Sequence, residues 1–290
     1  MVQHEPIVTE TCWRPLIDTP YLPGMTEHRA DLGRYDDWLA WLRKQAETDS
    51  DVQVVFVGGS AVTGGYDDHS DLDVEVLATP GQAVAAYRRL LDAALRDFEV
   101  HQVWELPEAT WPDGRQAFLN LTPDAGDMTR PTRIIDLHVS DLADEHRLVD
   151  ERRHGVPHVV HDPGGLVELR HDDESAMAAA RAEAIAQAAT RRQTAEWLVN
   201  RAIARGDEVE AIAFHLGYGI NPLVRLLRIK HCPARHDFGL RYLGIDLPAG
   251  YAERIAALMP GPDLAARAKE TFAWQDELIA ELAEPTTVGR

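Results

Sequence analysis

The sequence predicts an α/β (α+β) domain over residues 1–170, followed by an all-helical domain over residues 171–290. In the first half, short β-branched runs alternate with stretches of helical periodicity, which is typical of a sheet flanked by helices. From about residue 172 the chain becomes rich in alanine and leucine and loses the strand signals. We find no low-complexity linker between the halves, so the two domains are expected to follow one another directly.

The first half predicts a lead-in, two helices and five strands. The lead-in contains prolines and little periodicity, whereas the first helix carries Leu32, Tyr35 and Trp38 at helical spacing. The first strand is β-branched and ends in Gly58-Gly59-Ser60, which indicates a buried strand running into a turn. The elements expected, in order, are a lead-in at 1–28, a helix at 29–48, strands at 52–57 and 71–77, a helix at 81–97, and strands at 100–106, 116–121 and 132–139.

The second half predicts four helices, at 174–205, from 221 onward, at 249–259 and at 263–283. Gly206 is expected to cap the first of them at its C-terminus. Asn221 is expected as the N-cap of the second, because Pro222 then occupies its first turn.

Composition restricts the class of partner. The net charge of −19 disfavours binding to extended nucleic acid, because such proteins neutralise phosphates with clustered basic residues. It suits a small cationic partner, or it simply keeps the protein soluble. No apolar run reaches the roughly 20 residues of a membrane span, and the N-terminus lacks a signal-peptide pattern, so we expect a cytoplasmic protein without membrane contact. Cys12 and Cys232 show no metal-ligand spacing.

Two strands carry acids in an otherwise apolar setting. Side chains alternate across a strand, so Asp71, Asp73 and Glu75 point to one face and the apolar residues between them to the other. The last strand repeats the arrangement, with Asp136 and His138 on one face. One acidic row is explained by a solvated edge strand, but two such rows indicate carboxylates that are brought together. A divalent cation usually compensates their repulsion.

The residue types predict phosphoryl or nucleotidyl transfer. Carboxylates are hard ligands for Mg²⁺, which typically binds one or two of them together with substrate phosphate oxygens. Glycines at the preceding turn let backbone amides approach a triphosphate, and Ser60 adds a hydroxyl donor. The chain contains neither the P-loop pattern nor the spacing of a dinucleotide-binding loop.

Gly59-Ser60, a loop of about ten residues, and then Asp71-Leu72-Asp73 resemble the signature of the DNA polymerase β-like nucleotidyltransferase superfamily. The resemblance covers roughly residues 50–170, and the segment 159–169 is similar to the strand and turn that close the nucleotidyltransferase domain. The two-domain layout resembles that of bacterial antibiotic nucleotidyltransferases, especially the aminoglycoside type. The arginine often found after Gly-Ser in the family is replaced by Ala61-Val62-Thr63.

The resemblance implies a small mixed sheet and a site with assigned residues. Gly59 and Ser60 would contact the triphosphate. Asp71, Asp73 and Asp136 would bind two Mg²⁺ ions, and Asp136 would also take the proton of the attacking hydroxyl. The implied reaction transfers a nucleoside monophosphate from ATP or another nucleoside triphosphate to a hydroxyl of a small, aminoglycoside-like acceptor, and pyrophosphate is released.

Some assignments stay open. Lys230, in a basic segment at 226–243, would bind nucleotide phosphates, or the segment neutralises acidic neighbours. His138 lines the pocket or is a hydrogen-bonded neighbour, and Glu105 is a second candidate for the base. Two other functions remain: nucleotidylation of a protein or a tRNA, as in toxin-type enzymes, and nucleotide binding by a non-catalytic regulator.

Overall fold

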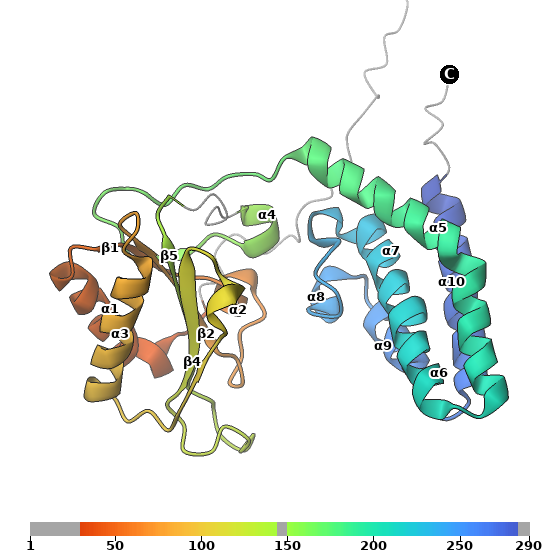
Figure 1. Cartoon of the computed structure of the whole chain (residues 1–290), viewed down its shortest axis with the longest axis horizontal. Helices are drawn as coiled ribbons and strands as arrows, with labels where there is room; N and C mark the ends of the chain where they lie inside the picture. Colours follow the sequence, from red (N-terminus) through yellow and green to blue (C-terminus); the bar gives the residue numbers. More distant parts are fainter. Residues whose placement is uncertain (1–29, 144–149, 284–290) are drawn as a thin grey trace, which may run out of the picture. The chain divides into compact units, whose positions relative to one another are not determined.

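The computed structural model describes residues 30–143 and 150–283. These residues form two compact units, divided between His171 and Asp172 (Figure 1). The first unit contains the sheet and the second is helical, as the sequence predicts. Among the helices of the described ranges, none is both long and apolar enough to cross a membrane.

The first unit is built on a six-stranded mixed sheet in the order β3-β4-β5-β2-β1-β6. Its central strands β2 and β5 pair in parallel, whereas the other pairs are antiparallel. In this register Asp73 lies opposite Asp136, and Glu75 lies opposite His138. The strands are β1 (Val52–Val57), β2 (Leu72–Ala78), β3 (Gln102–Glu105), β4 (Gly114–Asn120), β5 (Ile134–Asp141) and β6 (His158–His161).

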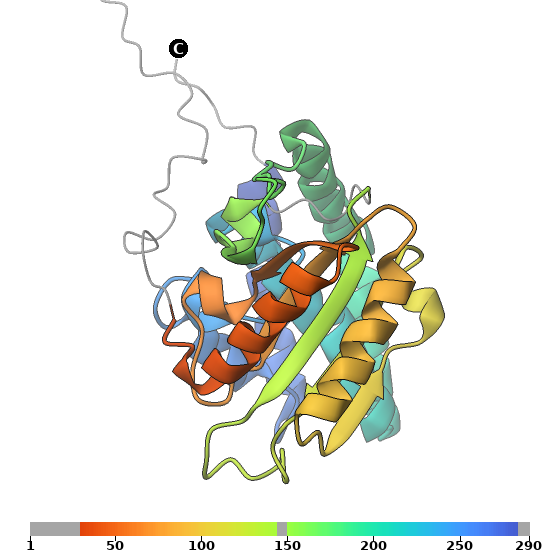
Figure 2. The same ribbon diagram turned by 90° about the vertical axis from the view of Figure 1, so that its left-hand side faces the viewer.

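Helices α1 (Asp36–Thr48) and α3 (Ala83–Asp97) cover one face of this sheet (Figure 2). Trp38 of α1 and Leu90 of α3 belong to the same core as Val74 and Leu137 of the central strands. Since neighbouring residues of a strand point to opposite faces, the acids of β2 and β5 lie on the face that these helices leave uncovered. The alternation expected for both strands is therefore confirmed.

A loop covers part of the opposite face. Asp162, directly after β6, accepts hydrogen bonds from the backbone N–H groups of Leu166 and Val167 at 2.8 and 2.9 Å. This turn places both apolar side chains against Val54 and Phe56 of β1. The cover thus lies over the β1 side of the face.

The second unit packs its helices around a core that includes Leu223, Leu227 and Trp274. Asp173 caps α5 by accepting the Ser175 N–H at 2.8 Å. Helices α5 and α10 lie side by side (Figure 1). The helices are α5 (Glu174–Arg205), α6 (Glu208–Phe214), the π-helical turn η5 (His215–Ile220), α7 (Asn221–His231), α8 (Leu243–Asp246), α9 (Tyr251–Leu258) and α10 (Leu264–Ala283); the sheet unit adds the single turns α2 (Ser60–Thr63) and α4 (Glu151–His154).

The prediction that Asn221 caps a new helix is wrong. Helix α6 continues through the π turn into α7, and Asn221 has helical dihedral angles. Pro222 lacks the N–H that would bond the carbonyl of Tyr218 four residues earlier. Gln275 supplies this donor instead, since its Nε2 lies 3.1 Å from the Tyr218 oxygen and 2.6 Å from that of Gly219. A side chain distant in sequence therefore allows a proline inside a continuous helix.

A buried ion network joins α7 to the segment that follows it, up to Asp246 at the end of α8. Asp246 accepts hydrogen bonds from Arg228 at 2.6 Å and from Arg235 at 2.8 Å, and all three side chains are at most 3% exposed. Arg228 also donates through Nε to the carbonyl of Gly239 at 2.8 Å. Removing one partner of such a network leaves a buried charge uncompensated, so the loss of any one member is expected to destabilise this unit.

Candidate active site

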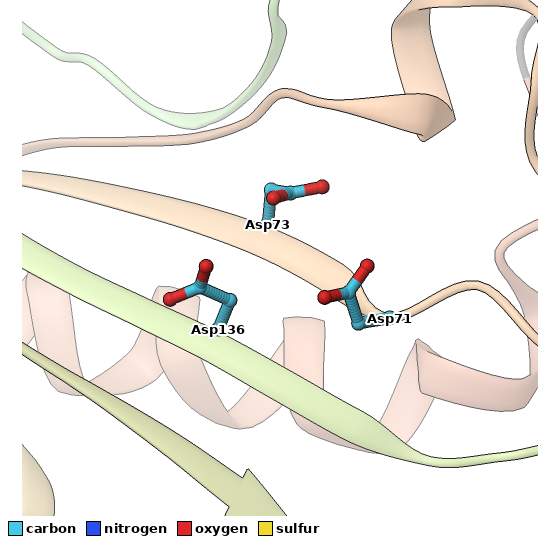
Figure 3. Close-up of side chains that lie close together, drawn as sticks. All are labelled: Asp71, Asp73 and Asp136. Carbon is cyan, nitrogen blue, oxygen red and sulfur yellow. The ribbon is translucent and has the colours of Figure 1, made fainter. Parts of the chain in front are cut away.

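Three carboxylates converge on the uncovered face of the sheet. Asp71 directly precedes β2, Asp73 lies within β2, and Asp136 lies on the neighbouring β5. One oxygen from each of them lies within 4.8 Å of the others. Figure 3 shows the three side chains on the same side of the two strands. The parallel register explains this, because it places Asp73 and Asp136 directly opposite one another.

The cluster disfavours its own ionised form. Burial raises the pKa of Asp73 to about 7, and the nearby charges of Asp71, Asp136 and Glu75 add to the effect. Burial likewise raises the pKa of Asp136 to about 6 and raises that of Asp71. A divalent cation bound by these oxygens would remove the repulsion. The donor set of hard, closely spaced carboxylates fits Mg²⁺.

Gly59 is required at the turn between β1 and the cluster. Its φ is +57°, and a Cβ at this position would lie 1.7 Å from Oδ2 of Asp73. The Gly58 N–H donates to the backbone carbonyl of Asp73 at 3.0 Å, which holds the turn against β2. The backbone can therefore approach the carboxylates only because no side chain is present there.

Ser60 begins the short turn α2 directly beside the cluster. Its backbone N–H bonds Asp73 and lowers the pKa of that carboxyl, which partly offsets the effect of burial. Its side chain is 7% exposed, and within the described parts of the chain its Oγ has no hydrogen-bond partner. A buried hydroxyl without a partner is costly unless a ligand completes it. This orphaned hydroxyl fits an oxygen-rich ligand next to the three acids.

Two residues ahead of α1 support the loop that leads to the cluster, and the sequence reasoning missed both. Arg34 donates through Nη2 to the carbonyls of Asp67 and Ser70 at 2.8 and 2.7 Å. The Tyr35 hydroxyl lies 3.3 Å from the Ser70 oxygen and 3.2 Å from that of Ile134. Because Ser70 precedes Asp71 and Ile134 begins β5, Tyr35 holds the starts of both acid-bearing strands.

A hydrogen-bonded chain orients Asp136, and it too was missed. The Trp111 indole N–H donates to Gln116 Oε1 at 2.7 Å, and Gln116 Nε2 donates to Asp136 Oδ1 at 2.6 Å. The second bond lowers the pKa of Asp136 against the effect of burial. Gln116 lies on β4 directly opposite His138, so only the sheet order reveals that it reaches the site.

The two other candidates for the base lie on opposite faces of the sheet. His138 shares the face of Asp136, as expected, and its Nδ1 lies 2.8 Å from Oε2 of Glu75. Glu105, by contrast, lies on the helix-covered face, where it accepts hydrogen bonds from Tyr87 at 3.1 Å and Arg88 at 2.6 Å. The alternation of β3 turns it away from the carboxylates, so the prediction of Glu105 as a second candidate for the base is wrong.

Lys230 lies in the helical unit, on α7. Its Nζ is 2.7 Å from Oε2 of Glu281, and the pair is partly exposed. Arg228 and Arg235 of the same basic segment are occupied by Asp246, so part of the segment does neutralise acidic neighbours. Binding of nucleotide phosphates by Lys230 stays a prediction.

No protein-family model matches the sequence, and the search of curated proteins finds no match.

Proposed function

We propose that this protein is a Mg²⁺-dependent nucleotidyltransferase that transfers a nucleoside monophosphate from a nucleoside triphosphate to a hydroxyl of a small acceptor. The observation that supports it best is the convergence of Asp71, Asp73 and Asp136 within 4.8 Å, beside a glycine turn whose backbone touches Asp73. Carboxylates from two strands and a turn open to phosphate oxygens are what an in-line displacement at phosphorus requires.

In this reaction the acceptor oxygen forms a bond to the α-phosphorus, and the bond from that phosphorus to its bridging oxygen breaks. Pyrophosphate leaves with the bonding electrons. Gly59 holds the departing phosphates through its backbone N–H, and Ser60 holds them through its hydroxyl. Bound Mg²⁺ would neutralise charge on the triphosphate and on the three acids.

Asp136 is the proposed acceptor of the hydroxyl proton. Its carboxylate stands on β5, on the side of the cluster away from the glycine turn. Gln116 occupies its Oδ1, which leaves the other oxygen to take a proton. His138, held by Glu75 two residues further along each strand, is the remaining candidate for this role. The pH dependence of turnover in Asp136→Asn and His138→Asn distinguishes the two.

A pyrophosphate-release assay tests the proposal. Purified protein with Mg²⁺ is given each of the four common nucleoside triphosphates and a panel of aminoglycosides and lincosamides. Release that depends on the acceptor and is lost in Asp71→Ala/Asp73→Ala establishes the activity. Asp92→Asn, which removes an exposed acid of α3, is the matched control and is expected to leave the rate unchanged.

Three other outcomes contradict the proposal. Release with a protein or a tRNA but with no small acceptor would assign the chain to the toxin-type enzymes. Tight triphosphate binding without release, unchanged in the double variant, would indicate a regulator. Release that persists at full rate in the double variant would show that the three carboxylates are not the catalytic metal site.

A further inference from the structure

Two aromatic side chains continue the row of carboxylates across the sheet. Phe118 of β4 lies directly opposite Asp136, and Trp104 of β3 lies directly opposite Phe118. Residues paired in this way share a face. Their neighbours confirm the face, since Val103 and Leu119 pack into the core beneath the helices. The order of side chains across this face, from β2 to β3, is therefore Asp73, Asp136, Phe118 and Trp104.

The outer end of this row is an exposed aromatic surface. The rings of Trp104 and Phe118 are stacked, with centroids 5.2 Å apart and planes 21° apart. Nevertheless 58% of Trp104 remains exposed. Large aromatic residues are usually well buried, so an exposed indole stacked on a second ring next to a catalytic carboxylate requires an explanation.

A second exposed indole lies on the same face. Trp111 is 40% exposed, and its ring lies 4.8 Å from that of His138. Its N–H is committed to Gln116, so its orientation is tied to that of Asp136. Aromatic surface therefore lies on β3 and beside β4, on one side of Asp136.

The position of this surface relative to the glycine turn indicates what it contacts. In an in-line displacement the attacking oxygen and the leaving group lie on opposite sides of the phosphorus. The turn at Gly59 follows β1, on the β2 side of the cluster, whereas β4 and β3 lie beyond Asp136. If the phosphates lie at the turn, the acceptor approaches over Phe118 and Trp104. The loop carrying Leu166 and Val167 packs with Val54 and Phe56 of β1 and Leu77 of β2, and neither Phe118 nor Trp104 belongs to that cluster.

We propose that Trp104 and Phe118 form the subsite that binds the ring of the acceptor. This inference rests on the proposed function and adds the chemical class of its substrate: the reacting hydroxyl is carried by a ring with an apolar face, either a sugar-like ring or an aromatic one. Trp104 lies two strand spacings, about 10 Å, from Asp136, so a ring stacked here holds a hydroxyl within reach of the carboxylate. Glu75, which lies on the same face as Asp73, favours an amino group on that ring.

Fluorine NMR of the full chain labelled with 5-fluorotryptophan tests ring binding without requiring turnover. The chain has seven tryptophans, and the resonance missing from Trp104→Phe is that of Trp104. The protein is held with Mg²⁺ and the non-transferable analogue α,β-methylene-ATP. The probes are kanamycin, with amino-sugar rings, tyramine, with an aromatic ring, and spermidine, a polyamine without a ring. We expect kanamycin or tyramine, but not spermidine, to shift the Trp104 resonance, and which of them does so identifies the kind of ring.

Kinetics with an acceptor found in the pyrophosphate assay provides the second readout. Trp104→Ala is expected to raise the acceptor KM about tenfold, as loss of one stacking platform does, with the triphosphate KM unchanged. Trp104→Phe keeps an aromatic face and is expected to restore most of the affinity. Trp197→Ala is the matched control, because Trp197 on α5 is similarly exposed, at 56%, and is not part of the row on the sheet.

The two proposals fail in different ways. Pyrophosphate release with an unchanged acceptor KM in Trp104→Ala overturns the ring subsite alone. A rise in the triphosphate KM instead would assign the surface to the nucleobase and also overturn it, as would equal shifts with spermidine or no shift with any probe. A ring-dependent shift in a chain that releases no pyrophosphate contradicts the proposed function and leaves the ring-binding site in place.

Discussion

Replacement of Asp73 by asparagine is expected to stabilise the metal-free protein at pH 8. The pKa of Asp73 is about 7 in the folded chain, against an ordinary value of 3.8. A carboxyl group with a raised pKa binds its proton more tightly when folded, so stability falls as the pH rises from about 4 to about 7 and the loss is complete above that range. Three pKa units at 1.36 kcal/mol each set a ceiling of about 4 kcal/mol on this loss.

Asparagine keeps the shape of the side chain and removes the charge. We expect a gain of about 2 kcal/mol at pH 8, because the substitution also weakens the bond from the Ser60 N–H and leaves Asp71 and Asp136 still facing one another. At pH 4 the wild-type carboxyl is largely protonated, so the gain is expected to vanish. Saturating Mg²⁺ at pH 8 should reverse the order of stability, since only the wild type retains the full set of ligands.

Urea unfolding in EDTA, followed by pulsed hydrogen exchange of the amides of β2 and β5, measures the free energy of unfolding of the sheet unit separately from that of the helical unit. The same experiment with Asp92→Asn controls for removal of an acid from a strongly negative chain and is expected to change stability by less than about 0.5 kcal/mol. If the Asp73 variant is less stable than the wild type at pH 8, or gains equally at pH 4 and pH 8, charge repulsion in the cluster is not the cause.

Three further results are expected. Gly59→Ala should reduce turnover by at least about 100-fold because its Cβ displaces a metal-binding carboxylate, whereas Gly64→Ala, with φ of +84° but no atom within 4 Å, should cost about 1 kcal/mol of stability and leave turnover intact; equal activity losses in the two would contradict this. Gln116→Leu should move the acidic limb of the pH–rate profile to higher pH, because the hydrogen bond from Gln116 lowers the pKa of Asp136 and its loss raises that pKa. An unmoved limb would show that Asp136 is not the base. Asp246→Ala should destabilise the helical unit by about 3–5 kcal/mol in calorimetry, and a loss below about 1 kcal/mol would show that its two arginine partners find other compensation.

The strands that carry the site were predictable because their pattern is local. Alternation along β2 and β5 is enough to place Asp73 and Asp136 on uncovered faces, and the structure confirms both faces. The parallel pairing of these strands is not local, since it depends on α3 and on two further strands between them. The sequence therefore indicates which acids face outward but not which strand lies beside which.

The supporting residues escaped prediction for the same reason. Gln116 and Tyr35 carry no motif and act on Asp136 and the strand starts only through sheet order and packing. The face of Glu105 was predicted wrongly because a four-residue strand shows too little alternation to assign the face of each side chain. Asn221 was taken for a cap because the contribution of Gln275 comes from a helix more than fifty residues later.

Because β2 pairs with β5, insertions within these two strands and substitutions in the segment between them are expected to have different effects. A one-residue insertion in either strand would turn Asp73 or Asp136 toward the core beneath α1 and α3, so both strands must keep their length for the carboxylates to converge. The stretch between them, residues 79–133, carries Phe118 and Trp104 and supplies none of the three carboxylates, although its strand β4 pairs with β5 and its Gln116 bonds Asp136. Under the proposed function, the carboxylates and the acceptor subsite are thus encoded in different segments of the chain, and a library of variants at Trp104 and Phe118 that spares Trp111 and Gln116 is expected to change the acceptor while leaving the three carboxylates and their support untouched.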